Sequence, residues 1–357
     1  PRVSLDVSAT QVDIGETVTL NVSASDNVGV EFLTLTVNGE AVALDSQGLA
    51  TLTLDNPGSF EVVATATDAA GNSGTATNTL VALDPSDVDA PVVDLISLAG
   101  GEPFTTLITA PTDIIGTVTD DNLLSYTLAI APVAGGDYTE IYRCTDTVTN
   151  NILGNFDPST LLNDTYRLRL SATDAAGNTA YDETLVDVTG ELKLGNFQLS
   201  FTDLSVPVSG IPIQVTRTYD TLTANTRDDF GYGWRMEFRD TDLRTSLGPD
   251  LELEEIGITS KGFAPGDRVY ITLPGGERQG FTFRPTLNPI NRFIPAAFNS
   301  SRLYRPAFEA DPGVTTNLTV QSVDLIQLEN GEFASLNGGL YNPANALYGF
   351  GGYYDLT

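Results

Sequence analysis

The stretch Ala66-Thr67-Asp68-Ala69-Ala70-Gly71-Asn72 recurs without change as Ala172-Thr173-Asp174-Ala175-Ala176-Gly177-Asn178, at an offset of 106 residues. An identical stretch at a fixed offset is typical of tandem modules. An offset of this size suits one small β-sandwich per module. The repeat therefore predicts two tandem sandwiches. Proteins of this architecture are more often spacers, adhesive modules or scaffolds than enzymes.

Alternation of apolar and polar residues predicts the strands of the first module, residues 1–84. Residues 17–22 and 32–37 alternate with a period of two, and residues 59–66 form a strand that enters the repeated stretch. Asn38-Gly39 is a strong signal for a two-residue hairpin turn.

Residues 85–91 begin and end with proline and carry acids between, which predicts a stiff, charged linker before the second module at residues 92–190. Asp121-Asn122 of the second module echoes Asp26-Asn27 of the first. The spacing from this pair to the repeated aspartate is longer in the second module, so we expect an insertion around residues 135–158.

From residue 191 to residue 357 the sequence is richer in arginine and aromatic residues. Strands are expected at residues 213–219, 268–273 and 280–283, with residues 274–277 as the hairpin loop between the last two. No stretch of the chain shows a convincing helical period of apolar residues. The predicted fold class is all-β throughout: two sandwiches, then a β-rich module.

The charge of the chain is strongly negative and unevenly spread. The net charge is −30, and residues 3–142 contain 20 Asp and Glu but no Lys, Arg or His. Carboxylates in such a region must be solvated, screened by salt or neutralised by bound metal. A saline or extracellular setting explains the acidity, and bound Ca²⁺ is the alternative because the acids cluster at turns.

The residues expected to bind Ca²⁺ are oxygen donors at turns and in the linker. Asp68 and Asp174 have a structural alternative, in which each carboxylate accepts backbone N–H bonds and fixes its turn. The spacing does not match an EF-hand loop. The candidate calcium ligands are Asp26, Asn27, Asp68, Asp84, Asp87, Asp89, Asp121 and Asp174.

The first 190 residues resemble bacterial immunoglobulin-like domains of surface adhesins and giant secreted proteins. Residues 25–30, Val37-Asn38-Gly39 and the two repeated stretches carry this resemblance. It implies two immunoglobulin-like sandwiches with a spacer or adhesive role, and it implies no catalysis.

Residues 195–312 resemble the segment that precedes the tyrosine–aspartate repeats of RHS-repeat proteins, the bacterial relatives of teneurins. Residues 204–213, Thr216-Arg217-Thr218-Tyr219-Asp220 and Phe230-Gly231-Tyr232-Gly233-Trp234 carry this resemblance, followed by residues 279–285 and 304–308. It implies the start of a β-shell that encloses a toxin or presents an adhesive surface. From the residues themselves, Trp234 and Tyr219 are expected core aromatics, with Arg217 stacked on them or ion-paired.

Composition argues against several function classes. Without histidine and with one cysteine, a serine or cysteine nucleophile lacks its usual base and a zinc site lacks its usual ligands. The acid pair Glu254-Glu255 has no pocket signature around it, so no enzyme is predicted. A phosphate backbone needs a basic face, which excludes nucleic acid. No run of 18 apolar residues exists, which excludes membrane insertion.

These observations predict a non-catalytic structural part of a large secreted or cell-surface bacterial protein, with acidic, calcium-stiffened spacers. Its expected partners are other domains or copies of the same protein. One alternative is a subunit of an extracellular fibre. Another is an adhesin that binds carbohydrate or a cell surface through the Gly- and Tyr-rich tail, residues 338–354. A third is the first part of an RHS toxin carrier.

Overall fold

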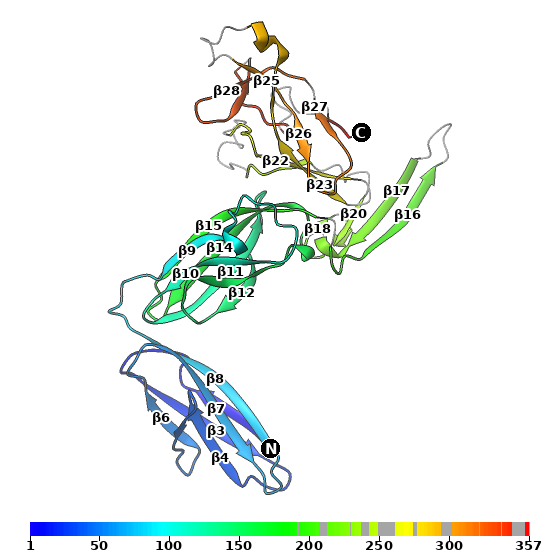
Figure 1. The fold of residues 1–357 in the computed structure, drawn as a ribbon. Coiled ribbons are helices and arrows are strands. Elements are labelled where there is room, and N and C mark those ends of the chain that lie inside the picture. The colour runs from blue at the N-terminus through cyan, green and yellow to red at the C-terminus, as the bar shows by residue number, and fades with distance from the viewer. Residues whose placement is uncertain are drawn as a thin grey trace.

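A computed structural model of the chain describes residues 1–190, 193–206, 213–228, 230–236, 243–248, 261–273, 277–293, 302–320, 322–336, 338–344 and 354–356. Over these residues the chain is all-β, as predicted, and its helical elements are short 3-10 turns. Two sandwiches follow one another along the molecule, and a third β-body with a projecting hairpin arm completes it (Figure 1). The 3-10 turns are η1 (Ala99–Gly101), η2 (Pro158–Thr160), η3 (Thr221–Thr223) and η5 (Pro289–Phe293).

The first sandwich packs a three-stranded sheet against a five-stranded sheet. The smaller sheet runs in the order β1 (Arg2–Val7), β3 (Thr17–Ser25) and β6 (Leu49–Thr53). The larger sheet runs in the order β2 (Gln11–Asp13), β8 (Ser73–Leu83), β7 (Gly58–Thr67), β4 (Phe32–Val37) and β5 (Glu40–Val42). Strand β2 is parallel to β8, with Gln11 opposite Val81 and Asp13 opposite Leu83.

Period-two alternation accounts for the core of the first sandwich. Every second residue of β3 is buried, so Val18, Leu20 and Val22 point inward and pack against Leu35 and Leu80 of the opposite sheet. The predicted hairpin is confirmed: β4 pairs antiparallel with β5, and Asn38 and Gly39 have φ of 49° and 84°. Both values lie in the left-handed region that this turn requires.

The second sandwich repeats this strand order except that it has no strand corresponding to β2. One sheet runs in the order β9 (Val92–Leu98), β10 (Thr112–Thr119) and β13 (Val148–Phe156). The other runs in the order β12 (Thr139–Cys144), β11 (Leu123–Pro132), β14 (Asp164–Asp174) and β15 (Thr179–Val188). The extra residues expected around 135–158 add no strand. They lengthen the counterparts of β5 and β6, since β12 has 6 residues and β13 has 9, against 3 and 5.

The third region divides into an arm and a compact body. The arm sheet is β16 (Gln198–Val206), β17 (Ile213–Asp220) and β20 (Trp234–Met236), with the small pair β18 (Arg227–Asp228) and β19 (Gly231–Tyr232) nearby. The body has the sheet β21 (Leu243–Thr245), β22 (Arg268–Thr272), β23 (Arg278–Phe283) and β26 (Phe308–Ala310). Two further sheets complete it: β24 (Thr286–Leu287), β25 (Leu303–Arg305), β28 (Leu325–Gln327) and β29 (Phe333–Ser335), then β27 (Leu318–Val320) with β30 (Tyr354–Leu356).

The body has an aromatic core in which ring edges meet ring faces. Phe283 packs against Phe263, Phe333 and Tyr341, and Phe263 also packs against Tyr341, with ring centroids 5.5–6.2 Å apart. Tyr341 belongs to the predicted adhesive tail, yet it is 2% exposed and is a core residue. Residues 345–353 of that tail, and the pair Glu254-Glu255, lie outside the described residues.

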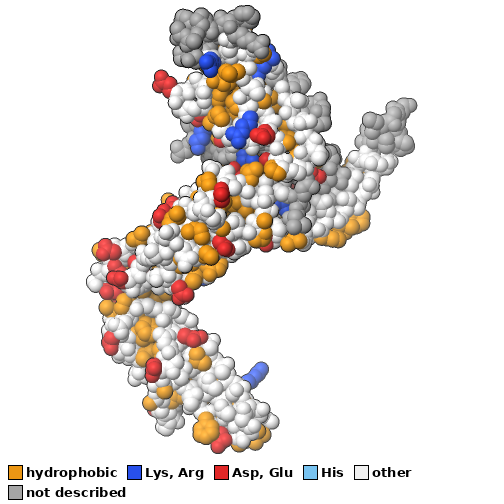
Figure 2. All heavy atoms as spheres, in the orientation of Figure 1, with side chains coloured by type: hydrophobic (Ala, Val, Ile, Leu, Met, Phe, Trp, Pro, Cys, Tyr) orange, Lys and Arg blue, Asp and Glu red, His pale blue; other side chains and the backbone are white. Residues whose placement is uncertain are grey.

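The uneven charge of the sequence is visible on the surface. Figure 2 shows acidic side chains scattered over both sandwiches and most of the basic side chains on the third region. No helix among the described residues is long and apolar enough to cross a membrane.

Candidate functional site

The two repeated stretches form the same turn, each built around one aspartate. The Asp68 carboxylate accepts from the backbone N–H groups of Ala70 and Asn72, both at 2.9 Å, and from the Asn72 side chain at 2.8 Å. The Asp174 carboxylate accepts from Asn178 in the same way, at 2.8 and 2.9 Å. The structural interpretation of these two aspartates as turn acceptors is therefore confirmed.

Hydrogen bonding makes the first of these turns sensitive to acid. The Asn72 side chain, followed by backbone N–H groups, lowers the pKa of Asp68 below 3.8. A carboxylate with a lowered folded pKa stabilises the fold at pH values above its unfolded pKa. That contribution is lost as the pH falls through the folded value.

We expect Asp68→Asn to melt at a lower temperature than the wild type at neutral pH, because an NH2 group would replace the carboxylate oxygen that accepts from the Asn72 amide. The difference in melting temperature should shrink as the pH falls through the lowered folded pKa of Asp68, because the wild-type carboxylate then becomes protonated. Calorimetry of the first sandwich at stepped pH measures this gap. Asp55→Asn is the matched control, because Asp55 is exposed; it should melt at the same temperature as the wild type at each pH. A gap for Asp68→Asn that does not change with pH would contradict the argument.

Asp26 accepts hydrogen bonds within its own loop. Its carboxylate accepts from the backbone N–H groups of Val28 at 2.9 Å and Gly29 at 3.3 Å. The Val28 bond lowers the pKa of Asp26. Asn27 follows in the same exposed loop.

The linker is docked on the second sandwich by the second repeated turn. The Asn178 side chain donates to the backbone carbonyls of Asp87 and Asp89, at 3.1 and 3.2 Å. The Asn122 side chain donates to the Asp87 carboxylate at 2.9 Å. Asp84 lies at the start of the linker, where the hydroxyl and backbone N–H of Ser86 lower its pKa.

This junction gathers several oxygen donors around one acid that sequence reasoning missed, Asp120. Burial raises the pKa of Asp120, and the negative charges of Asp174, Asp87 and Asp121 raise it further. The side-chain oxygen of Asn122 is buried here without a hydrogen-bond partner. Among the described residues, no three acidic side chains converge closely enough to form a ready metal site. The candidate calcium ligands therefore lie in three places: the two repeated turns, the loop of Asp26 and Asn27, and this junction.

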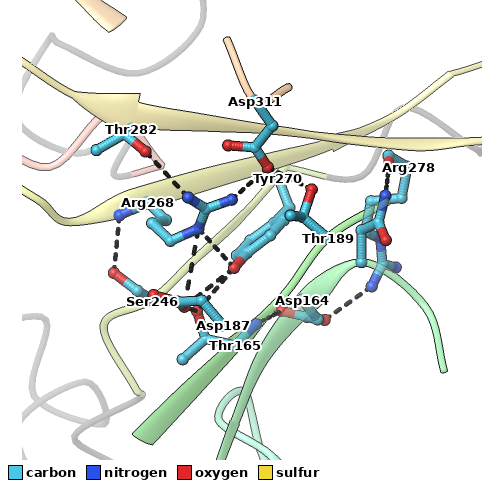
Figure 3. A network of polar contacts seen from close by, with 11 residues as sticks. Asp164, Thr165, Asp187, Thr189, Ser246, Arg268, Tyr270, Arg278, Thr282 and Asp311 are labelled. Atoms are coloured by element: carbon cyan, nitrogen blue, oxygen red, sulfur yellow. Dashed lines mark hydrogen bonds and ion pairs between the residues drawn. The ribbon is translucent and has the colours of Figure 1, made fainter. Parts of the chain in front are cut away.

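A second group of buried charges joins the second sandwich to the third body (Figure 3). Arg268 of β22 is 1% exposed and Asp311 is 4% exposed, and the two form an ion pair. The Arg268 guanidinium also donates to the Tyr270 hydroxyl at 2.8 Å and to the Thr282 hydroxyl at 2.9 Å. These bonds offset the cost of removing the cation from water.

Gly280 permits this pair to lie against β23. A Cβ atom at position 280 would lie 2.2 Å from an Asp311 carboxylate oxygen and 2.7 Å from an Arg268 nitrogen. Any side chain larger than hydrogen would therefore displace the pair.

The same network crosses to the second sandwich through two acids. Asp187 of β15 accepts from the Tyr270 hydroxyl at 3.1 Å, and Thr189 donates to Asp311 at 2.7 Å. Asp164, at the start of β14, accepts from the Arg278 guanidinium at 2.7 Å. Buried charge-assisted bonds of this kind fix the relative position of the two bodies.

The arm has one apolar face with no described segment packed on it. Leu199, Phe201, Leu204 and Val206 of β16 are 40, 45, 52 and 39% exposed. A register shift between Thr202 and Leu204 keeps all four on one face. In the arm sheet β16 is an edge strand, because its described neighbour is β17 alone. Figure 2 shows hydrophobic side chains along this side of the arm.

The predicted aromatic cluster lies at the base of this face. Trp234 and Tyr219 have ring centroids 5.4 Å apart and are half-buried rather than in a closed core. The Arg217 guanidinium lies 5.3 Å from the Trp234 centroid and 3.1 Å from the Asp203 carboxylate. Arg217 is therefore both the stacking partner and an ion-pair partner.

Comparison with protein families gives one match, to a domain of unknown function (DUF6531), over residues 175–247. This segment runs from the second repeated turn through the arm to β21. It overlaps the region that resembles RHS-repeat proteins, but the matched description does not name them, so that resemblance stays a prediction. No curated protein matches the chain.

Several solved structures show likeness to the chain at low sequence identity. Fibronectin(III)-like modules of Clostridium thermocellum CbhA are 13% identical, with a TM-score of 0.25, over 53% of this chain and 94% of theirs. A Ca²⁺-stabilized, ice-binding adhesin of an Antarctic bacterium is 15% identical, with a TM-score of 0.20, over 94% and 96%. SGBP-B of the Bacteroides ovatus mixed-linkage glucan utilization locus, in complex with a heptasaccharide, is 12% identical, with a TM-score of 0.20, over 80% and 67%.

Proposed function

We propose that the chain is a non-catalytic spacer and scaffold of a large secreted or cell-surface bacterial protein. The observation that carries this proposal is that hydrogen bonds or ion pairs lie at both joints: between the linker and the second sandwich, and between the second sandwich and the third body. Asn178 holds the linker on the second sandwich, and the Arg268 and Arg278 ion pairs join that sandwich to the third body. A spacer needs such fixed joints, since a free linker would let its domains rotate.

The charge distribution supports an extracellular setting. A stretch of 140 residues without a cation suits a saline medium, where salt screens the repulsion between carboxylates. The finer proposal, that the third region begins an RHS-type shell, rests on the sequence resemblance alone.

We further propose that Ca²⁺ stiffens the joint between the linker and the second sandwich. The supporting observations are the negative charges of Asp174 and Asp87, which raise the pKa of Asp120, and the unpartnered side-chain oxygen of Asn122. Hard oxygen donors of these types fit Ca²⁺. The bound ion would offset the mutual repulsion of the carboxylates and hold the linker in place.

Calcium binding at this joint is expected to raise the melting temperature of the second sandwich. A ligand at about 100 times its Kd stabilises by about 2.7 kcal/mol, or roughly 10 °C for a domain of this size. Melts in millimolar CaCl₂ and in EGTA measure the gap. Asp87→Ala should remove it, and Asp137→Ala, at an exposed loop, should leave it intact. Identical wild-type melts with and without chelator would rule out a stabilising site.

A second candidate function, a subunit of an extracellular fibre, is favoured by the apolar face and free edge of β16. The open edge of β16 in one copy can pair head to tail with another strand edge of the next copy, which covers the apolar side chains and extends a filament. Negative-stain microscopy distinguishes the two functions: a spacer gives discrete elongated particles, and a fibre subunit gives filaments.

If the arm drives assembly, Phe201→Lys together with Leu204→Lys should leave the chain monomeric. Both side chains are exposed, so the change should cost little stability. Sedimentation velocity over a range of concentrations measures the oligomeric state. Val28→Lys, at an exposed residue of the first sandwich, is the matched control. A wild-type chain that is monomeric at every concentration would exclude the fibre function.

A further inference from the structure

A cavity of about 340 Å³ lies where the second sandwich, the base of the arm and the third body meet. It is at the small end of the range for ligand pockets, roughly 300–1,000 Å³. The inner wall comes from residues just before β14 and just after β15 and from β23. The mouth is formed by exposed polar residues of the connector and arm, among them Asn196 and Gln198.

The deep wall contains an acceptor that the protein leaves unused. Asn163 is 9% exposed, and its side-chain nitrogen donates to the Arg278 carbonyl at 2.8 Å. Its side-chain oxygen is buried and has no hydrogen-bond partner. Leaving a buried acceptor without a donor costs roughly 1–3 kcal/mol. The fixed nitrogen also holds the amide in one orientation.

The same cavity contains a donor with spare capacity. The Lys193 ammonium donates to the Pro158 carbonyl at 3.2 Å, which uses one of its three N–H groups. Burial lowers the pKa of Lys193 to about 8, while Asp157 acts in the opposite direction. The other N–H groups of Lys193 are available to a bound molecule.

Other polar side chains of the wall are held by bonds within the protein. The Gln279 side chain donates to Glu277 at 2.7 Å and accepts from Thr316. The Thr189 hydroxyl donates to Asp311 at 2.7 Å. These residues are already oriented before a ligand arrives, which reduces the entropy lost on binding.

We propose that this cavity binds a neutral, hydroxyl-rich ligand, a single sugar residue. A hydroxyl group both donates and accepts, so neighbouring hydroxyls can donate to Asn163 and accept from Lys193. An anion would meet the Asn163 oxygen and the Glu277 carboxylate, and a cation would meet Lys193 and Arg278. Leu162, Leu222 and Val314 provide an apolar wall for the C–H face of a sugar ring.

This site is independent of the spacer function, and none of its lining residues belongs to the Gly- and Tyr-rich tail. The spacer function needs only fixed joints, so it stands whether or not a sugar binds. The open mouth allows the bound ring to be either a free monosaccharide or the end of a longer glycan.

The test uses the full chain and saturation-transfer NMR followed by calorimetric titration. The probes are the methyl glycosides of glucose, galactose, mannose and N-acetylglucosamine, with glucuronate and inorganic phosphate as anionic probes. We expect at least one neutral glycoside to bind. Lys193→Met should weaken that binding by about tenfold or more, because it removes the charged donor without removing the side-chain bulk.

The matched control is Lys261→Met, since Lys261 is the other lysine of the chain and does not line this cavity. Asn163→Leu provides a second variant, and thermal melts confirm that each variant is folded. Three outcomes would overturn the proposal: no neutral glycoside binds the wild type, Lys193→Met and Lys261→Met bind alike, or an anionic probe binds more tightly than every neutral one. Comparison of the best monosaccharide with its disaccharide identifies a free sugar or a glycan end as the source.

Discussion

Asp311→Ala is expected to destabilise the third body by about 3–5 kcal/mol, because it leaves a buried cation without its ion-pair partner. Arg268 is 1% exposed and cannot reach water without opening the sheet. Its remaining carboxylate neighbour, Asp187, lies 3.7 Å away and belongs to the second sandwich. Thr189 would also lose the acceptor of its 2.7 Å bond.

Calorimetry of the full chain measures this loss as a lower melting temperature for the third body. Glu309→Ala is the matched control, since the Arg284–Glu309 pair has side chains 59 and 71% exposed. Such surface pairs contribute only about 0–1 kcal/mol. Replacing both charges, Arg268→Met with Asp311→Leu, should recover most of the stability. Equal losses for Asp311→Ala and Glu309→Ala would show that Arg268 is solvated.

Asp164→Ala should separate the second sandwich from the third body. Asp164 is 2% exposed, and its partner Arg278 comes from β23 of the other body. Removing one partner of a buried pair typically costs about 3–5 kcal/mol. Because the two partners lie in different bodies, the loss destabilises the contact between the bodies.

Two measurements detect this separation. In the wild type, the second sandwich and the third body should melt in one transition, and in Asp164→Ala they should melt in two. Small-angle X-ray scattering should show a wider distribution of particle lengths for the variant. Asp137→Ala, at an exposed loop of the same sandwich, should match the wild type in both. A single transition and an unchanged scattering profile for Asp164→Ala would mean that other contacts hold the joint.

The strands and turns were predictable because their causes are local. Alternation in residues 17–22 fixes which side chains of β3 face the core, and Asn38-Gly39 supplies the two left-handed residues that a hairpin needs. The turn role of Asp68 is local too, since its partners lie within four residues.

The joints were not predictable because their partners are distant in sequence. Arg268 and Asp311 are separated by 43 positions, and Arg278 and Asp164 by 114. Nothing in the local pattern of a strand distinguishes a buried arginine from an exposed one. Asp120 was missed for the same reason, because its neighbours Asp87 and Asp174 meet it only in the folded chain. The orphaned oxygen of Asn163 likewise exists only once β23 is in place.

The short parallel strand of the first sandwich determines how this domain would respond to a pulling force. Strand β2 lies near the start of the domain and β8 ends it, and the two are parallel over three residue pairs. Tension between residues 1 and 84 draws β2 and β8 in opposite directions along their common axis. The bonds of this parallel ladder are then strained together, in shear, instead of breaking one after another as in an unzipped hairpin. A ladder of only three residue pairs is thus the clamp of this domain against extension.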